Sequence, residues 1–142
     1  MRLNVNDTDF SEVLGMHWNL TEVKNKSVTI NIDRTKAPID IYTIKFETAH
    51  LTGTGAVNFY SASYKARENH KLSIVGIARI RDDTLYEMED FTENEFFRYL
   101  QRANGWDLHG GKLELYTYDE NGVRAIMIFF HKREGQSLIP SP

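Results

Sequence analysis

The stretch LTGTGAVNFY, residues 51–60, places two glycines and an asparagine within sequence that otherwise alternates between apolar and polar residues. Glycine inside a strand indicates a bulge, a bend or a close approach of another backbone. Asparagine tolerates left-handed backbone geometry and can bond to a neighbouring amide. The stretch therefore predicts a corner where one strand turns into the next. We expect Gly53 or Gly55 to adopt backbone angles that other residues reach only with strain, and Asn58 to bond to main chain nearby.

Strand patterns flank this corner on both sides. Apolar and polar residues alternate over 16–23, although Val23 breaks the alternation, and again over 28–32. Such alternation is typical of half-buried strands. Further strands are predicted over 39–46, 61–66, 71–80, 112–118 and 123–131, and a short helix over 9–14. Asn121-Gly122 lies between the last two strands and predicts a hairpin.

One segment is strongly helical in its pattern. Thr92 and Glu95 have the spacing of a capping box, in which each side chain bonds to a backbone amide of the other. Phe91 and Phe96 flank the cap at the spacing of a hydrophobic staple. We expect the principal helix to run from near Glu87 to Ala103, with Gly105 after its end.

These elements predict a mainly β (α+β) protein: a small antiparallel β-barrel-like domain of about eight strands with one principal helix. About eight strands can close into a small barrel, which removes exposed sheet edges. An open sheet covered by the helix is the alternative. No linker or repeat divides the chain, so residues 1–142 are expected to form a single domain with a core over about 15–131 and flexible termini.

The composition excludes several classes of function. A chain of 142 residues with a net charge of −3 has no basic stripe for nucleic acid, and we expect a monomer without nucleic-acid partners. The absence of cysteine excludes disulfides and thiolate chemistry. No transmembrane segment and no signal peptide is recognisable. The expected location is the cell envelope or periplasm if a leader has been removed, and otherwise the cytoplasm.

Few residues have the pattern of a catalytic or metal site. The histidines are scattered, with none at metal-ligand spacing, and Gly53-Thr54-Gly55 lacks the lysine of a phosphate-binding loop. No metal, cofactor or catalytic residue is therefore expected. Asp82 and Asp83 could take part in acid–base chemistry but more simply place negative charge before the helix. The candidates for ligand binding are Trp18, Tyr42, Asn58, Tyr60 and Tyr64, which could line a pocket or simply fill a core.

Several segments occur in the order and spacing of a known family. They are the sequences at 15–20, 44–46 and 77–81, the corner itself, the acidic-then-apolar pattern of Glu93, Phe96 and Leu100, and the turn at 108–115. Together they resemble the META domain family of HslJ-like proteins over most of the chain. Many members carry two cysteines near the corner, and this chain has none, so any redox role of those members does not apply.

The resemblance implies a small barrel-like domain, often of envelope proteins or lipoproteins and linked to stress, without catalytic residues of its own. The leading hypothesis is accordingly a non-catalytic domain of the cell envelope or stress response that binds a protein partner or a small apolar ligand. The alternative is an unrecognised hydrolase or metal-dependent enzyme that uses Asp82, Asp83 and a histidine.

Overall fold

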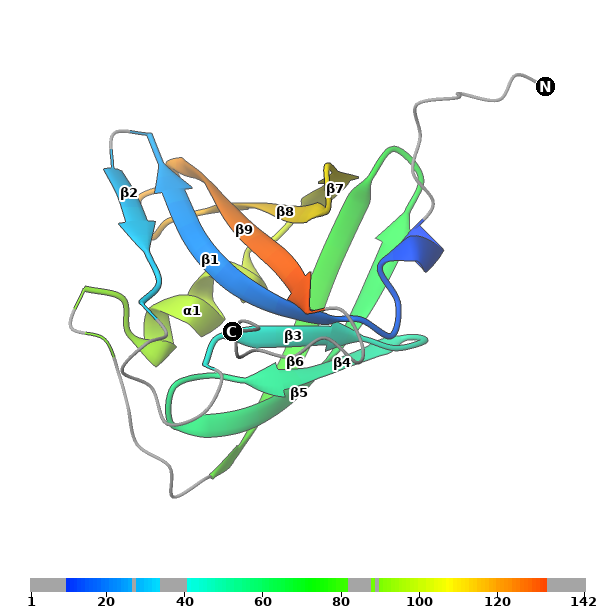
Figure 1. Cartoon of the computed structure of the whole chain (residues 1–142), viewed down its shortest axis with the longest axis horizontal. Coiled ribbons are helices and arrows are strands. Elements are labelled where there is room, and N and C mark those ends of the chain that lie inside the picture. Colours follow the sequence, from blue (N-terminus) through cyan, green and yellow to red (C-terminus); the bar gives the residue numbers. More distant parts are fainter. Residues whose placement is uncertain (1–9, 27, 34–40, 82–87, 89, 133–142) are drawn as a thin grey trace, which may run out of the picture.

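A computed structural model describes residues 10–26, 28–33, 41–81, 88 and 90–132 (Figure 1). Its elements follow in chain order: η1 (Phe10–Glu12), β1 (His17–Asn25), β2 (Val28–Asn31), β3 (Thr43–Phe46), β4 (His50–Thr54), β5 (Asn58–Arg67), β6 (Lys71–Arg81), α1 (Glu93–Gln101), β7 (Gly105–His109), β8 (Lys112–Tyr118) and β9 (Arg124–Lys132). Asp82, Asp83 and Glu87, which were singled out in the sequence, lie outside the described residues.

Within the described residues, nine antiparallel strands form one sheet in the order β2-β1-β3-β4-β5-β6-β7-β8-β9, and β1 also pairs with β9. Figure 1 shows these first and last strands of the ring, β1 in blue and β9 in orange, side by side. The pairing closes eight of the strands into a ring and leaves β2 outside it, beside the second half of β1. The barrel-like prediction is confirmed, and the open sheet is not formed.

The ring is weakest between β6 and β7, where a single register pair, Lys71 and Gly105, joins the strands. Helix α1 connects these two strands in the chain and packs against β6 and β8. Its side chains Phe96, Phe97 and Leu100 are buried. The helix therefore contributes apolar surface to the core beside the seam, where the ladder of backbone hydrogen bonds is shortest.

A bulge explains why Val23 departs from the alternation of its strand. The register of β1 against β9 shifts between Leu20 and Glu22, which inserts Thr21 as an extra residue. Trp18, Leu20 and Val23 can therefore all face the core, with exposed fractions of 1%, 0% and 0%. The Thr21 hydroxyl donates to the carbonyl of Ile128 across the pair, at 3.0 Å.

The capping box is confirmed, but the predicted helix bounds are wrong. Thr92 has extended backbone angles, and its hydroxyl accepts the amide of Glu95 while the Glu95 carboxylate accepts the amide of Thr92. An N-cap residue lies outside the helix, so α1 begins at Glu93 and not before the cap. It ends at Gln101, two residues earlier than expected, and the capping amide of Arg102 bonds to carbonyls of the last turn.

Two strands were not predicted as separate elements. β4 carries Gly53, and β7 begins at Gly105, so neither has the unbroken alternation that predicts a strand. The hairpin between β8 and β9 is confirmed, although Asn121 has no positive φ and only Gly122 does, at 80°. The turn is instead held by the Asp119 carboxylate, which accepts the amides of Asn121 and Val123.

Candidate functional site

The four candidate aromatic residues lie in the core. Trp18, Tyr42, Tyr60 and Tyr64 have exposed fractions of 1%, 0%, 2% and 8%. The polar atom of each ring donates to a backbone carbonyl: those of Val13 at 3.1 Å, Phe91 at 2.7 Å, Thr43 at 2.6 Å and Glu47 at 2.5 Å, in the same order. Burial raises the pKa of the Tyr60 hydroxyl well above its usual value. This placement favours the interpretation that the rings fill the interior and tie strands together.

The corner turns β4 into β5 as predicted, but its glycines do not have the strained backbone angles that we expected, and the close approach of another group is the reason for them instead. Neither Gly53 nor Gly55 has a positive φ. A Cβ atom on Gly53 would lie 2.2 Å from the Thr43 carbonyl oxygen, and one on Gly55 would lie 2.4 Å from a carboxylate oxygen of Glu93. Glycine is required at both positions because another group approaches closely, which depends on tertiary packing and leaves no trace in local conformation.

The residue with a strained backbone is Tyr42, which lies beside the corner and bonds to Gly55. Tyr42 has a φ of 55°, in the left-handed region that a bulky side chain rarely adopts, and is fully buried. Its amide donates to the carbonyl of Gly55, and its ring contacts Phe91 and Phe96 at centroid distances of 5.2 and 5.0 Å. Contacts on both sides of the residue therefore maintain the unfavourable backbone angle.

The Glu93 nest, defined here as the amides of residues 56–58 and the Asn58 side chain around the Glu93 carboxylate, joins the corner to helix α1. One carboxylate oxygen of Glu93 accepts the amides of Ala56, Val57 and Asn58 at 2.9, 2.6 and 2.8 Å. The other oxygen accepts the Asn58 side-chain amide at 2.6 Å. Glu93 is only 4% exposed and is the first residue of α1, where the helix dipole also favours negative charge.

The Asn58 side chain therefore bonds to a distant carboxylate, whereas the expected bond to nearby main chain is made by the Asn58 carbonyl oxygen, which accepts the amide of Gly55 at 2.8 Å. The sequence offered a signal for Glu93, since it is an acidic residue in a helix first turn, but that position is normally solvated. With its oxygens held by donors from the corner, the Glu93 carboxylate stabilises the fold and is poorly placed to exchange protons with a substrate.

Replacing Asn58 with alanine should lower the free energy of unfolding by about 1–3 kcal/mol, because Glu93 loses one donor in a buried site. Urea denaturation followed by fluorescence measures this change. Asn94, an exposed residue of the same helix turn as Glu93, provides a matched Asn→Ala control that we expect to be nearly neutral. A control loss as large as that of the Asn58 variant would contradict the role assigned to Asn58.

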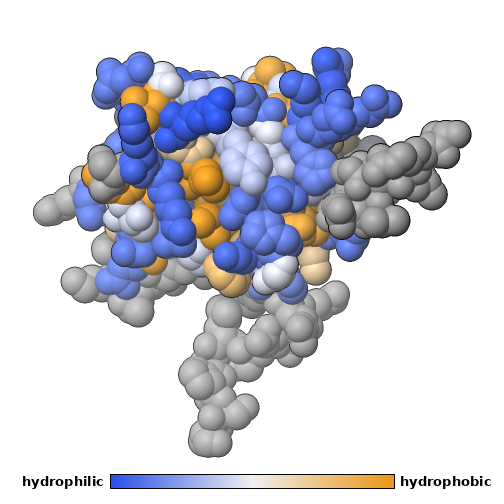
Figure 2. Space-filling model, turned by 90° about the horizontal axis from the view of Figure 1, so that it is seen from above, coloured by the Kyte–Doolittle hydropathy of each residue, from blue (hydrophilic) through white to orange (hydrophobic). Residues whose placement is uncertain are grey.

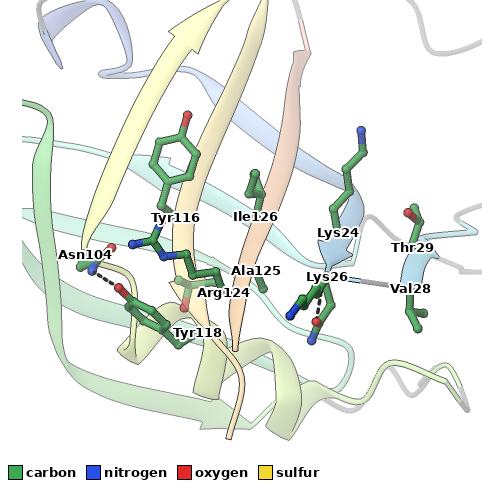
Figure 3. A pocket seen from close by; sticks show the side chains of 12 residues that line it. Lys24, Lys26, Val28, Thr29, Asn104, Tyr116, Tyr118, Arg124, Ala125 and Ile126 are labelled. Carbon is green, nitrogen blue, oxygen red and sulfur yellow. Dashed lines mark hydrogen bonds between the residues drawn. The ribbon is translucent and has the colours of Figure 1, made fainter. Parts of the chain in front are cut away.

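An open groove lies elsewhere, on the face formed by β1, β2, β8 and β9 (Figure 3). It has a volume of about 800 Å³ and is lined by Lys24, Asn25, Lys26, Val28, Thr29, Asn104, Tyr116, Thr117, Tyr118, Arg124, Ala125 and Ile126. We call it the basic groove, because the described residues of its lining include three cationic side chains and no carboxylate. None of its residues was among the sequence candidates.

The strand register explains how the basic groove is assembled. Tyr116 is paired with Ile126, Ile126 with Lys24, and Lys24 with Thr29, so a row of outward side chains crosses β8, β9, β1 and β2. Figure 3 shows Tyr116, Ile126 and Lys24 side by side along this row. The floor of the groove is therefore aromatic and aliphatic, and the cationic side chains of Lys24, Lys26 and Arg124 lie along it.

The three cations of the groove are available to a ligand. Lys24, Lys26 and Arg124 are exposed. Within the described residues, the one ion pair that involves any of them joins Lys24 to Glu22 at 4.0 Å, a distance at which an exposed pair contributes little. The nearby Asp119 carboxylate bonds to Asn25, and this hydrogen bond, with those from Val123 and Asn121, lowers the pKa of Asp119.

This closed antiparallel sheet with one helix is the architecture of a known class of domains. The META domain family model matches residues 11–132, so the chain belongs to the META domain family. No curated protein sequence matches the chain. Two solved structures have a similar fold. A protein from Burkholderia xenovorans is 17% identical with a TM-score of 0.62, covering 94% of this chain and 97% of its own. A DUF4847 family protein from Bacteroides vulgatus is 12% identical with a TM-score of 0.59, covering 88% and 98%.

Proposed function

We propose that this META domain is a non-catalytic binding module that holds an acidic, extended segment of a protein partner in the basic groove. The observation that carries the proposal is the lining of the groove, which among the residues placed by the structure has three cations, no carboxylate and an apolar floor. Opposite charge steers a partner and sets specificity, and the floor supplies apolar contact. A small ligand inside the barrel is less well supported, since the candidate aromatic rings are buried with their polar atoms bonded to main chain.

An extended segment fits the groove better than a compact ligand because β2 forms one of its walls. Within the described part of the chain, β2 pairs with β1 alone. The second edge of β2 therefore offers backbone donors and acceptors to an added strand, which is a common mode of peptide recognition. Val28 and Thr29 of β2 line the groove, and Val28 is 56% exposed, so side chains of an added strand would contact apolar surface there.

Exposed apolar side chains occur both in the groove and outside it, where Phe59 of β5 and Ile80 of β6 lie opposite each other as register partners. Large hydrophobic residues are exposed on four different strands: Val28, Phe59, Val75, Ile80 and Phe130. Figure 2 shows, on the face in view, small hydrophobic areas in orange bordered by hydrophilic residues in blue. A partner of mixed charged and apolar character matches such a surface better than a purely apolar one.

We propose no enzymatic activity and a place in the cell envelope or in a stress response, as the family resemblance suggests. Among the described residues, no helix is long and apolar enough to span a membrane. Subcellular fractionation of the host with an antibody to this chain tests the location. Turnover in a broad hydrolase screen that is lost on replacing a single histidine would contradict the absence of catalysis.

Reversing the charge of the groove should abolish the preference for acidic peptides. The test uses an array of acetylated decapeptides that alternate leucine with glutamate, glutamine or lysine, with Kd measured in solution for those retained. We expect the glutamate peptides to bind best, and we expect added salt to weaken their binding because it screens the charges. The triple variant Lys24→Glu, Lys26→Glu, Arg124→Glu should weaken their binding by at least about tenfold, or 1.4 kcal/mol.

A matched control separates the groove from overall charge. Lys65 is exposed on β5 and is absent from the groove lining, so Lys65→Glu alters net charge without altering the groove. Because Lys65→Glu changes one charge and the triple variant changes three, the effect of Lys65→Glu on peptide binding is also compared with that of the single variant Lys24→Glu. Equal binding of acidic and basic peptides, or an equal effect of Lys65→Glu and Lys24→Glu, would contradict the proposal.

A further inference from the structure

The hairpin of β7 and β8 brings one imidazole and two carboxylates together on its outer face. Asp107 and Glu114 are directly opposite each other in the register, and His109 follows Asp107 by two residues, on the same face. Gly110 and Gly111 make the tight turn, with φ values of 59° and 76°. One ligand atom from each of Asp107, His109 and Glu114 lies within 4.8 Å of the others.

We propose that Asp107, His109 and Glu114 form a binding site for a divalent transition-metal ion, with Zn²⁺ the ion that fits best. The His109 Nε2 atom lies 3.3 Å from Glu114 Oε1 and 4.0 Å from Asp107 Oδ2. Zinc binds nitrogen and carboxylate oxygen at about 2.0–2.2 Å, so the donors of a tetrahedral site lie about 3.4 Å apart. The three side chains therefore need only small rotamer adjustments to share one ion, with water in the remaining position.

Neighbouring groups orient the two carboxylates. The Tyr116 hydroxyl donates to Glu114 Oε1 at 2.8 Å, and the amide of Leu108 donates to Asp107 Oδ1 at 2.9 Å. Because the Leu108 amide holds Oδ1, the other Asp107 oxygen, Oδ2, faces His109, at 4.0 Å from its Nε2 atom. Partners of this kind fix the orientation of metal ligands and raise affinity.

The local charge also favours a cation. Two carboxylates directly opposite each other on antiparallel strands repel, and this destabilises the pairing unless positive charge lies between them. Burial is the main cause that raises the pKa of Tyr116, and the hydrogen bond and negative charge of Glu114 raise it further. Lys112, the register partner of His109, lies on the same face and places one positive charge beside the two carboxylates. A divalent ion shared by the two carboxylates would offset the repulsion between them directly.

The test is calorimetric titration of the full chain, free of any histidine tag, with ZnCl₂ in a non-chelating buffer. We expect one site, and a melting temperature that rises with Zn²⁺ and falls back when a chelator is added. His109→Ala should weaken binding at least about tenfold, and Tyr116→Phe about tenfold through loss of orientation alone. Because these side chains are on the outer face, circular dichroism should show each variant folded.

His50→Ala is the matched control, since His50 is an exposed histidine on β4 that lies outside the cluster. It should bind Zn²⁺ as tightly as the unchanged chain. The histidine resonances in an NMR titration locate the ion independently, and those of His109 should shift first. The proposal is overturned if no saturable binding occurs up to about 1 mM Zn²⁺. It is also overturned if His50→Ala weakens binding as much as His109→Ala.

Discussion

Replacing Glu93 with alanine should lower the free energy of unfolding by about 3–5 kcal/mol, because the amides of Ala56, Val57 and Asn58 lose their shared acceptor. Each unpaired buried amide costs about 1–3 kcal/mol, and water admitted to the site can satisfy only part of them. Urea denaturation at neutral pH measures the loss. The matched control is Glu95→Ala, a glutamate two residues along the same helix turn, whose cap interaction contributes about 1 kcal/mol.

A double-mutant cycle with Gly55 tests the same contact from the other side. Alone, Gly55→Ala should cost about 2–3 kcal/mol, because the added Cβ would lie 2.4 Å from a Glu93 oxygen that three amides hold in place. In the Glu93→Ala background the obstructing carboxylate is gone, and the same substitution should be nearly neutral. The coupling energy of the pair should therefore be large. Additive losses, or a Glu93→Ala variant no less stable than Glu95→Ala, would contradict the nest.

Gly53→Ala should destabilise the protein by about 3 kcal/mol and abolish the hydrogen bond that the Tyr60 hydroxyl donates to the Thr43 carbonyl. The added Cβ would lie 2.2 Å from the Thr43 carbonyl oxygen and 2.8 Å from the Tyr60 ring. Tyr60 is the register partner of Gly53, and its ring passes over the glycine so that its hydroxyl reaches Thr43 on β3. No rotamer change can relieve a collision with backbone, so β3 and β4 must separate.

Thermal unfolding compares this variant with Gly105→Ala, which also adds a methyl group to a strand glycine. There the nearest atom is the His70 carbonyl oxygen at 3.3 Å, so a small shift suffices and we expect a loss of about 1 kcal/mol or less. The contact interpretation is wrong if the two variants melt at the same temperature. A Tyr60→Phe variant, which keeps the ring and removes the hydrogen bond, should lose only about 1 kcal/mol.

Most elements of the fold could be predicted because their signals are local. The strand at 112–118 has the bounds expected from its alternation, and the hairpin after it follows from the turn residues at its end. The capping box of Thr92 and Glu95 was likewise visible as a spacing of three. β7 was missed because five residues that begin with glycine carry too little periodicity, and its strand character comes from pairing with β8.

The candidate sites could be predicted much less well. The basic groove draws on residues from positions 24 to 126, which are brought together by register between strands distant in the chain. Asp107, His109 and Glu114 lie within eight residues of one another, so their spacing was visible, but the sequence indicated only a turn at 108–115, and their convergence depends on the pairing of β7 with β8. The aromatic residues were noticed for their type, and their burial decides that they pack the core.

The sequence by itself determined the class of the fold: the alternating strands, the capped helix and the corner at residues 51–60, since each depends on contacts between residues close in the chain. Only the tertiary structure decided what the corner is for. Gly53 and Gly55 are glycines because Thr43, Tyr60 and Glu93 occupy the space that a side chain would need. The physical reason is that steric exclusion and the pairing of a buried carboxylate depend on distances across the barrel, which local conformational preference does not encode.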